Sequence, residues 1–273
     1  MKLKINRHLK TFLDSFKLDH IFWKTLLTDV IAFALIIGLF LSFGSLLTAK
    51  AYDISGGLTV EQLKTALLSG SQDYNKAFSD NVRNFLFIMV GGSLLIILLA
   101  LAVYSFSRMV IWDTIMKKHT SVRSFLKWNL ISLLMIVTGV LYSLLSIALK
   151  SPFVFLTPFK NQVLGLFYTN MITAFFMFIF LVFMFLAYKS FAKSNKVWES
   201  IGMSFHNWKK NWSLLSYGIL LMLVVMLAAN VISYLIQRVF IYQPKWILTM
   251  IGLGFLLIVI AWARLYVARI VKG

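Results

Sequence analysis

The residues of this chain that could do chemistry are the few polar side chains within its long apolar stretches. Asp29, Asn170 and Asn230 lie inside such stretches. A polar side chain inside a membrane is costly to leave unpaired, so it marks a transport path, a coupling site or a contact between helices. Two interpretations of Asp29 stay open: pairing with a neighbouring Lys or Arg, or a coupling or partner-binding role. For the asparagines, hydrogen bonding between helices is the first interpretation and contact with a solute the second.

The expected surroundings of Asp29 follow from its position near the start of an apolar stretch. Asp29 follows Lys24 by five residues, which is about 7 Å along a helix. So close to a helix start, the helix dipole favours a negative charge. Arg108 and Arg264 end two other apolar stretches. We interpret them as anchors whose charged ends reach the aqueous boundary.

Patterns of catalytic and metal-binding residues are absent from the sequence. It contains no HExxH, no GxSxG and no GxxxxGK[ST], so metalloprotease, serine hydrolase and nucleotide-phosphate chemistry have no support. No spacing typical of metal ligands recurs among the four histidines, which are His8, His20, His119 and His206. Cysteine is absent as well. The sequence therefore predicts no enzymatic activity, no cofactor and no metal ion.

The composition places the chain in a membrane. Of its 273 residues, 60% are hydrophobic and 13% are charged, whereas soluble domains carry about 25% charged residues. The mean hydropathy is +0.85. These values exclude a soluble enzyme, a disordered chain and a secreted disulfide scaffold.

Six apolar stretches are long enough to cross a bilayer, which takes roughly 20 helical residues. Their approximate bounds are 25–48, 85–107, 127–149, 166–188, 213–236 and 246–264. Because the backbone in lipid must satisfy its own hydrogen bonds, these stretches are predicted to be helices. We therefore expect an all-α integral membrane protein with six transmembrane helices and a single membrane domain over residues 1–273.

The basic residues divide unequally between the two predicted faces. Nineteen of the 27 Lys and Arg residues fall on the face that carries both termini, which the positive-inside rule places in the cytoplasm. The first apolar stretch exceeds a signal-peptide core of about 7–15 residues, so residues 1–24 are predicted to be an uncleaved cytoplasmic segment. A cleavage-like Thr48-Ala49-Lys50-Ala51 leaves processing as the alternative. We expect a multi-pass protein of a prokaryotic plasma membrane.

We interpret the formal charge of +18 as a signal that orients the chain in the membrane and as an attraction to anionic lipid headgroups. No nucleic acid is therefore expected as a partner. A protein partner remains a further expectation, and the sequence does not set the oligomeric state. The candidate headgroup contacts are Lys117, Lys118, Arg123, Lys193, Lys196, Lys209 and Lys210.

Residues 49–84 are predicted to form an outer loop that contains a short helix. Thr59 and Gln62 have the spacing of a capping box, in which each side chain satisfies a backbone N–H at the helix start. Gly70 is expected to end this helix, because glycine commonly follows the last helical turn.

Three segments on the predicted inner face share a Ser-Phe pair followed by Trp and Lys. The pairs are Ser15-Phe16, Ser124-Phe125 and Ser204-Phe205. Each segment precedes an outward-going span, so we expect three repeated helical hairpins, each introduced by an amphipathic helix on the inner surface. In the third segment, Val197, Ile201 and Trp208 fall on one apolar stripe. Trp with Lys at a span entry is also an ordinary interface anchor.

Residues 196–205, followed by Lys209-Lys210-Asn211-Trp212, resemble the helix-entry pattern of a loose group of prokaryotic membrane proteins. These are the YciC-like and glycerophosphodiesterase membrane-domain-like families. The resemblance covers this segment well and the six-span layout loosely. It implies a polytopic membrane protein and supplies no catalytic residues.

Two functions are compatible with these features. The first is a scaffold, assembly factor or accessory subunit that acts without catalysis through protein or lipid contacts. The alternative is a permease or lipid-handling transporter, with or without coupling to a separate ATPase, since internal repetition is also typical of transporters. A polar cavity lined by Asp29, Asn170 or Asn230 would favour the transporter, and a closed bundle would favour the scaffold.

Overall fold

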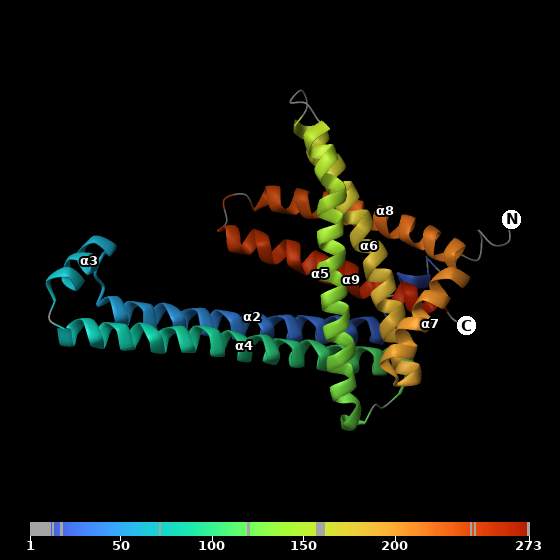
Figure 1. The fold of residues 1–273 in the computed structure, drawn as a ribbon. Helices are drawn as coiled ribbons and strands as arrows, with labels where there is room; N and C mark the ends of the chain where they lie inside the picture. Colours follow the sequence, from blue (N-terminus) through green and yellow to red (C-terminus); the bar gives the residue numbers. More distant parts are fainter. Residues whose placement is uncertain are drawn as a thin grey trace. The chain divides into compact units, whose positions relative to one another are not determined.

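The computed structural model describes residues 12, 14–16, 19–70, 72–118, 121–156, 162–240, 242 and 244–271. All regular structure in these ranges is helical (Figure 1). Six helices are long and apolar enough to cross a membrane. The predicted all-α, multi-pass membrane fold is therefore confirmed.

Each predicted span corresponds to one long helix. These helices are α2 (His20–Ser55), α4 (Gln72–Met116), α5 (Phe125–Leu156), α6 (Gln162–Ser194), α8 (Trp212–Val239) and α9 (Lys245–Ile270). The shorter elements are α3 (Val60–Ser69), the 3₁₀ turn η1 (Val122–Ser124) and α7 (Val197–Lys210).

The predicted outer loop over 49–84 is mostly helical, which corrects the expectation. Helix α4 begins at Gln72, because no Gly or Pro before Gly91 interrupts its polar first turns. Helix α2 continues until Gly56 and Gly57, whose φ angles of +58° and +74° suit glycine and end the helix. The short helix between them is confirmed.

The capping of α3 matches its prediction in detail. The backbone N–H of Gln62 donates to Thr59 Oγ1 at 3.3 Å, and the Thr59 N–H donates to Gln62 Oε1 at 3.0 Å. Gly70 is the C-cap. This agreement follows from the local character of a capping box, which depends on residues only three positions apart.

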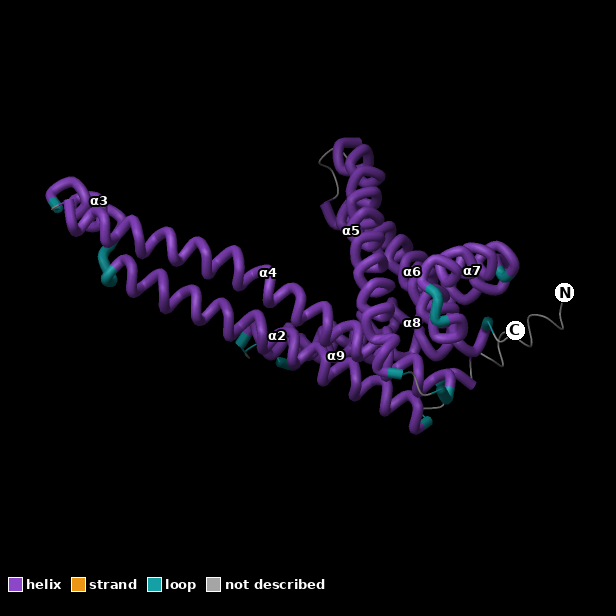
Figure 2. Tube along the Cα trace, turned by 60° about the horizontal axis from the view of Figure 1, so that its bottom comes forward, coloured by secondary structure: helices purple, strands orange, loops and turns teal. Residues whose placement is uncertain are grey.

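The chain divides into two compact units. Unit 1 comprises residues 1–30 and 105–273, and unit 2 comprises residues 31–104. Within unit 2, α2 and α4 lie side by side in both views, and α3 lies in the connection between them (Figures 1 and 2). A Cβ atom added to Gly92 of α4 would overlap the ring of Phe43 of α2. The two helices therefore approach closely at a residue without a side chain.

Helix α6 is the central element of unit 1. It packs against α5, α7, α8 and α9. Half of the residues in its most apolar stretch are buried inside the protein. Large aromatic side chains make up much of the core around it, including Trp112, Trp128, Phe178, Phe185, Tyr188, Phe191, Trp262 and Tyr266. Unit 1 therefore has a protein core of its own as well as helix surfaces for lipid.

The proposed repeat has one shared structural feature. Ser15, Ser124 and Ser204 are all buried. Their hydroxyl groups donate to a backbone carbonyl three or four residues earlier, at 2.5 Å, 2.6 Å and 2.6 Å, respectively. Each serine thus satisfies its hydroxyl within its own segment.

The elements around these serines differ, which corrects the expectation of a surface helix before every hairpin. Before α5 the described residues form only η1, because the Ser121 carbonyl accepts from both the N–H and the hydroxyl of Ser124 and closes a tight turn. Before α8 the helix α7 is present. Its predicted stripe contributes to the protein interior: Val197 is buried, and Ile201 and Trp208 pack against the core of unit 1.

Candidate functional site

The main polar feature of unit 1 is a buried cluster of Asp29 from α2, Arg108 from α4 and Arg264 from α9. Only 4%, 7% and 0% of these residues, respectively, is exposed. Arg264 Nη2 donates to Asp29 Oδ2 at 2.6 Å, and Arg108 Nη2 donates to Oδ1 of the same carboxylate. One carboxylate therefore bridges two guanidinium groups, and the three side chains together carry a net positive charge.

Asp29 reaches this cluster because it lies on the buried stripe of α2. Phe22, Thr25 and Asp29 are spaced by three and four residues and are all buried, as expected for one face of a helix. The Thr25 hydroxyl donates to the Phe22 carbonyl at 2.9 Å. The polar groups of this face are thus hydrogen-bonded inside the protein.

The two arginines are held inside the protein on their own helices. Arg108 lies next to the buried Ser107, whose hydroxyl accepts from Arg108 Nε at 3.3 Å. The Arg264 guanidinium carbon lies 5.8 Å from the ring centroid of Phe185, a distance suited to a cation–π contact. The interpretation of both arginines as surface anchors is therefore wrong, because a carboxylate within hydrogen-bond distance makes burial of their charge tolerable.

The expected surroundings of Asp29 also need correction. Helix α2 begins at His20, so Asp29 lies about 13 Å from the helix start. The dipole effect falls off within the first turn. Pairing with a basic residue is confirmed, but the partners are arginines of two other helices rather than Lys24, which is exposed. What stabilises the carboxylate is tertiary contact.

The N-terminal segment of unit 1 is attached to α9 by further polar contacts. Trp262 Nε1 donates to Ser15 Oγ at 3.0 Å. Arg269 donates to Asp19 Oδ2 and to the Asp14 carbonyl, both at 2.8 Å. Together with the charge cluster, these contacts fix the beginning of α2 to the end of α9.

The residues predicted to contact lipid headgroups are all exposed, namely Lys117, Lys118, Arg123, Lys193, Lys196, Lys209 and Lys210. Lys118 also donates to the carbonyls of Ala192 and Lys193 at 3.3 Å and 3.4 Å, at the end of α6. Lys196 pairs with Glu199 at 3.0 Å. Part of this charge therefore supports helix ends, and contact with headgroups stays a prediction.

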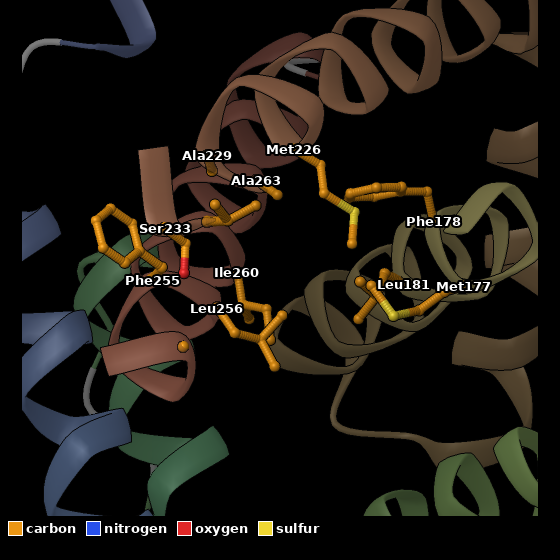
Figure 3. Close-up of a pocket in the computed structure, with 12 residues that line it drawn as sticks. Met177, Phe178, Leu181, Met226, Ala229, Ser233, Phe255, Leu256, Ile260 and Ala263 are labelled. Atoms are coloured by element: carbon orange, nitrogen blue, oxygen red, sulfur yellow. The ribbon is translucent and has the colours of Figure 1, made fainter. Parts of the chain in front are cut away.

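An apolar cavity of about 180 Å³ lies among α6, α8 and α9. In Figure 3, Met226 points toward Phe178, and the hydroxyl of Ser233 lies on the other side of the cavity. Among the described lining residues, Ser233 carries the one hydroxyl group. The remaining lining residues are Met177, Phe178, Leu181, Met226, Ala229, Gly252, Phe255, Leu256, Val259, Ile260 and Ala263.

Of the three predicted intramembrane polar side chains, the structure describes only that of Asp29. Asn170 lies on α6 and Asn230 on α8, but their side chains are outside the described residues. Asp29 is not among the described residues that line the cavity. Contact of Asn170 or Asn230 with a cavity therefore stays a prediction, and Asp29 lies in the charge cluster instead.

Within the described residues, no three His, Cys, Asp or Glu side chains are grouped so that they could hold a metal ion. His20 and His206 are exposed. His8 and His119 lie outside the described residues.

Comparisons with known proteins give no relative: no family model, curated protein or solved structure matches the chain. The resemblance of residues 196–212 to the YciC-like group stays a prediction. Fold and site together define a multi-pass α-helical membrane protein in which a buried Arg–Asp–Arg cluster connects three of the membrane-spanning helices.

Proposed function

We propose that this chain is a non-enzymatic membrane protein that acts as a scaffold, assembly factor or accessory subunit through contacts with protein or lipid. The observation that carries the proposal is the environment of Asp29. Both of its carboxylate oxygens accept from arginines of the same chain, and only 4% of the residue is exposed. A carboxylate that couples transport usually faces a water-filled cavity or path, whereas this one joins helices.

The apolar cavity supports the same proposal. Its volume of about 180 Å³ lies below the roughly 300–1,000 Å³ of typical ligand pockets. The described part of its lining offers one hydroxyl and no charge with which to orient a polar solute. Such a space is suited to part of a lipid chain or to an apolar side chain of a partner.

The proposed location is the plasma membrane of a prokaryote, with both termini in the cytoplasm. The asymmetry of basic residues supports this orientation. Because the chain has no cysteine, single replacements Lys64→Cys and Lys209→Cys test it directly. A membrane-impermeant maleimide should label the Lys64→Cys variant in intact cells and the Lys209→Cys variant only after lysis; the reverse order would refute the orientation.

The function is tested by purifying the tagged chain in a mild detergent and identifying stoichiometric protein and lipid by mass spectrometry. The matched variant is Asp29→Leu/Arg108→Met/Arg264→Met, which removes all three charges together. If the cluster only joins helices, this variant should retain the partners or lipids of the wild type. Loss of every partner from a folded triple variant would contradict the proposed role of the cluster.

A lipid-handling transporter is the second candidate. The apolar lining of the cavity, which suits a lipid chain, favours the transporter, whereas its small volume favours the scaffold. The same purification discriminates the two. The transporter would become the better proposal if a nucleotide-binding ATPase copurified in stoichiometric amount and the chain transferred lipid in proteoliposomes.

A further inference from the structure

A basic pocket of about 180 Å³ lies in unit 1 where α6, α7 and α9 meet the start of α8. It is separate from the charge cluster and from the apolar cavity. Its lining consists of Leu186, Lys189, Ser190, Lys193, Asn207, Lys210, Asn211, Ile270 and Val271.

The chemistry of this lining suits an anion with several acceptor oxygens. Among the described lining residues, three are lysines, two are asparagines and one is a serine, and none carries a carboxylate side chain. Lysine, asparagine and serine all donate hydrogen bonds, and lysine adds a full positive charge. A phosphate group presents the matching acceptors and negative charge.

Lys189 forms a fixed part of the pocket. It is 7% exposed, and its Nζ donates to the carbonyls of Ala268 and Val271 at 3.2 Å and 2.5 Å. These carbonyls belong to the end of α9, so the ammonium group is held in place by that helix terminus. Lys193 and Lys210 are exposed and can adjust to a ligand.

Helix termini around the pocket modify this charge without reversing it. Asn211 caps the end of α7 and the start of α8, so one negative and one positive helix end meet there. The end of α9 adds a second negative end. Each terminus is equivalent to roughly half an elementary charge, whereas the lysines contribute three full positive charges. The pocket therefore stays positive.

The position of the pocket along the helices favours a phosphate at the membrane surface. The spanning parts of α6 and α9 end at Ser194 and Ile270, and that of α8 starts at Trp212. Trp208 of α7 and Trp212 of α8 lie on the two helices that meet at Asn211, and their ring centroids are 5.6 Å apart. Tryptophan is enriched at the headgroup level. Basic pockets between spanning helices at this level commonly bind lipid headgroups.

We propose that this pocket binds a phosphate group, held by Lys189, Lys193 and Lys210 with Asn207 and Asn211. The phosphate of an anionic phospholipid and that of a soluble phosphate compound share this chemistry. The lipid source rests on the proposed function, in which the chain acts through lipid contacts. The pocket itself rests only on its lining.

The test measures binding of phosphatidic acid, phosphatidylglycerol and inorganic phosphate to the full chain in a neutral detergent. The pocket variant is Lys193→Gln/Lys210→Gln. The control is Lys24→Gln/Lys127→Gln, which removes the same charge from exposed lysines that belong neither to the lining nor to the predicted headgroup contacts. We expect the pocket variant to weaken phosphatidic acid binding by roughly tenfold or more, and the control by about twofold or less.

Each outcome has a defined meaning. Equal losses in both variants, or unchanged binding in the pocket variant, would show diffuse surface attraction and overturn the site. If inorganic phosphate binds more tightly than the lipids and the pocket variant loses this binding, the site is confirmed with a soluble ligand as its source; if the lipids bind more tightly, it is confirmed as a headgroup site. Because binding is measured on the isolated chain, failure here is distinguishable from failure to find a partner protein.

Discussion

The two units of this chain are stabilised by different means. In unit 1, large aromatic side chains are buried together with Asp29, Arg108 and Arg264. In unit 2, Ala32 is the one described residue that is buried, and its helices expose most of their apolar side chains. Exposure is not a defect in a membrane, because lipid tails are as apolar as leucine. The helices of unit 2 must therefore be held together by close steric fit. Those of unit 1 are held together by steric fit and by ion pairs and hydrogen bonds.

The largest effect should follow from removing the carboxylate of unit 1. Asp29→Ala leaves two buried guanidinium groups without their shared acceptor, and breaking a buried pair in this way costs about 3–5 kcal/mol. We expect a large fall in the unfolding midpoint in detergent, or loss of folded protein. The matched control in unit 2 is Asp53→Ala, whose ion pair with Lys50 is exposed and whose loss should cost about 1 kcal/mol or less.

A second variant keeps this prediction informative if Asp29→Ala does not fold. Replacing all three groups, as in Asp29→Leu/Arg108→Met/Arg264→Met, removes both the attraction and the cost of burying charge. Such replacements are often neutral or stabilising, so folded protein should return. If the triple variant were as unstable as Asp29→Ala, the charges themselves would not explain the loss.

The next effect concerns packing in unit 2, where Gly91 and Gly92 form a matched pair. A Cβ atom at Gly92 would overlap the ring of Phe43, whereas one at Gly91 has no neighbour within 4 Å. Gly92→Leu should therefore cost about 1–3 kcal/mol through overpacking, and Gly91→Leu should cost much less. Hydrogen exchange resolved by peptide would show the loss of protection within residues 31–104.

Adding Phe43→Ala separates the steric effect from a general intolerance of leucine. The double variant Phe43→Ala/Gly92→Leu should regain part of the protection, because the smaller side chain makes room. Equal effects of leucine at both glycines would mean that close approach at Gly92 does not hold the hairpin together.

The sequence predicts the features that depend on neighbouring residues. The six spans follow from hydropathy, and the cap of α3 follows from Thr59 and Gln62. The helix ends are less predictable, because a hydropathy pattern detects only the part of a helix that lies in lipid. The first turns of α4, from Gln72 onward, contain too many polar residues to be detected as part of a span.

The charge cluster is only half predictable. Asp29 is recognisable as a charged residue inside an apolar stretch, but its partners lie 79 and 235 residues away in the sequence. One signal was present: Arg264 is followed by Leu265, Tyr266 and Val267, so apolar residues continue past it, as they would not at a surface anchor. The basic pocket is also half predictable. Lys193 and Lys210 are recognisable as basic residues beside predicted spans, but packing of α6, α7 and α9 adds Lys189 and the two asparagines.

The smallest effect concerns Asp19, which has two functions in unit 1. Its Oδ1 accepts from the Phe22 N–H at 2.9 Å near the start of α2, and its Oδ2 accepts from Arg269 at 2.8 Å. Asparagine is as good a helix cap as aspartate, so Asp19→Asn should remove only the ion pair. Because this pair is partly exposed, the loss should be about 1 kcal/mol or less.

Asp19→Ala removes the cap as well and should cost about 1 kcal/mol more. Salt separates the two contributions, because it screens charges that are open to solvent. The stability difference between wild type and Asp19→Asn should shrink as salt rises, whereas that between Asp19→Asn and Asp19→Ala should persist. If the stability difference between wild type and Asp19→Asn were independent of salt, the Asp19–Arg269 pair would behave like the buried Asp29 cluster. Ion pairs that salt does not screen would then stabilise the surface of unit 1 as well as its interior.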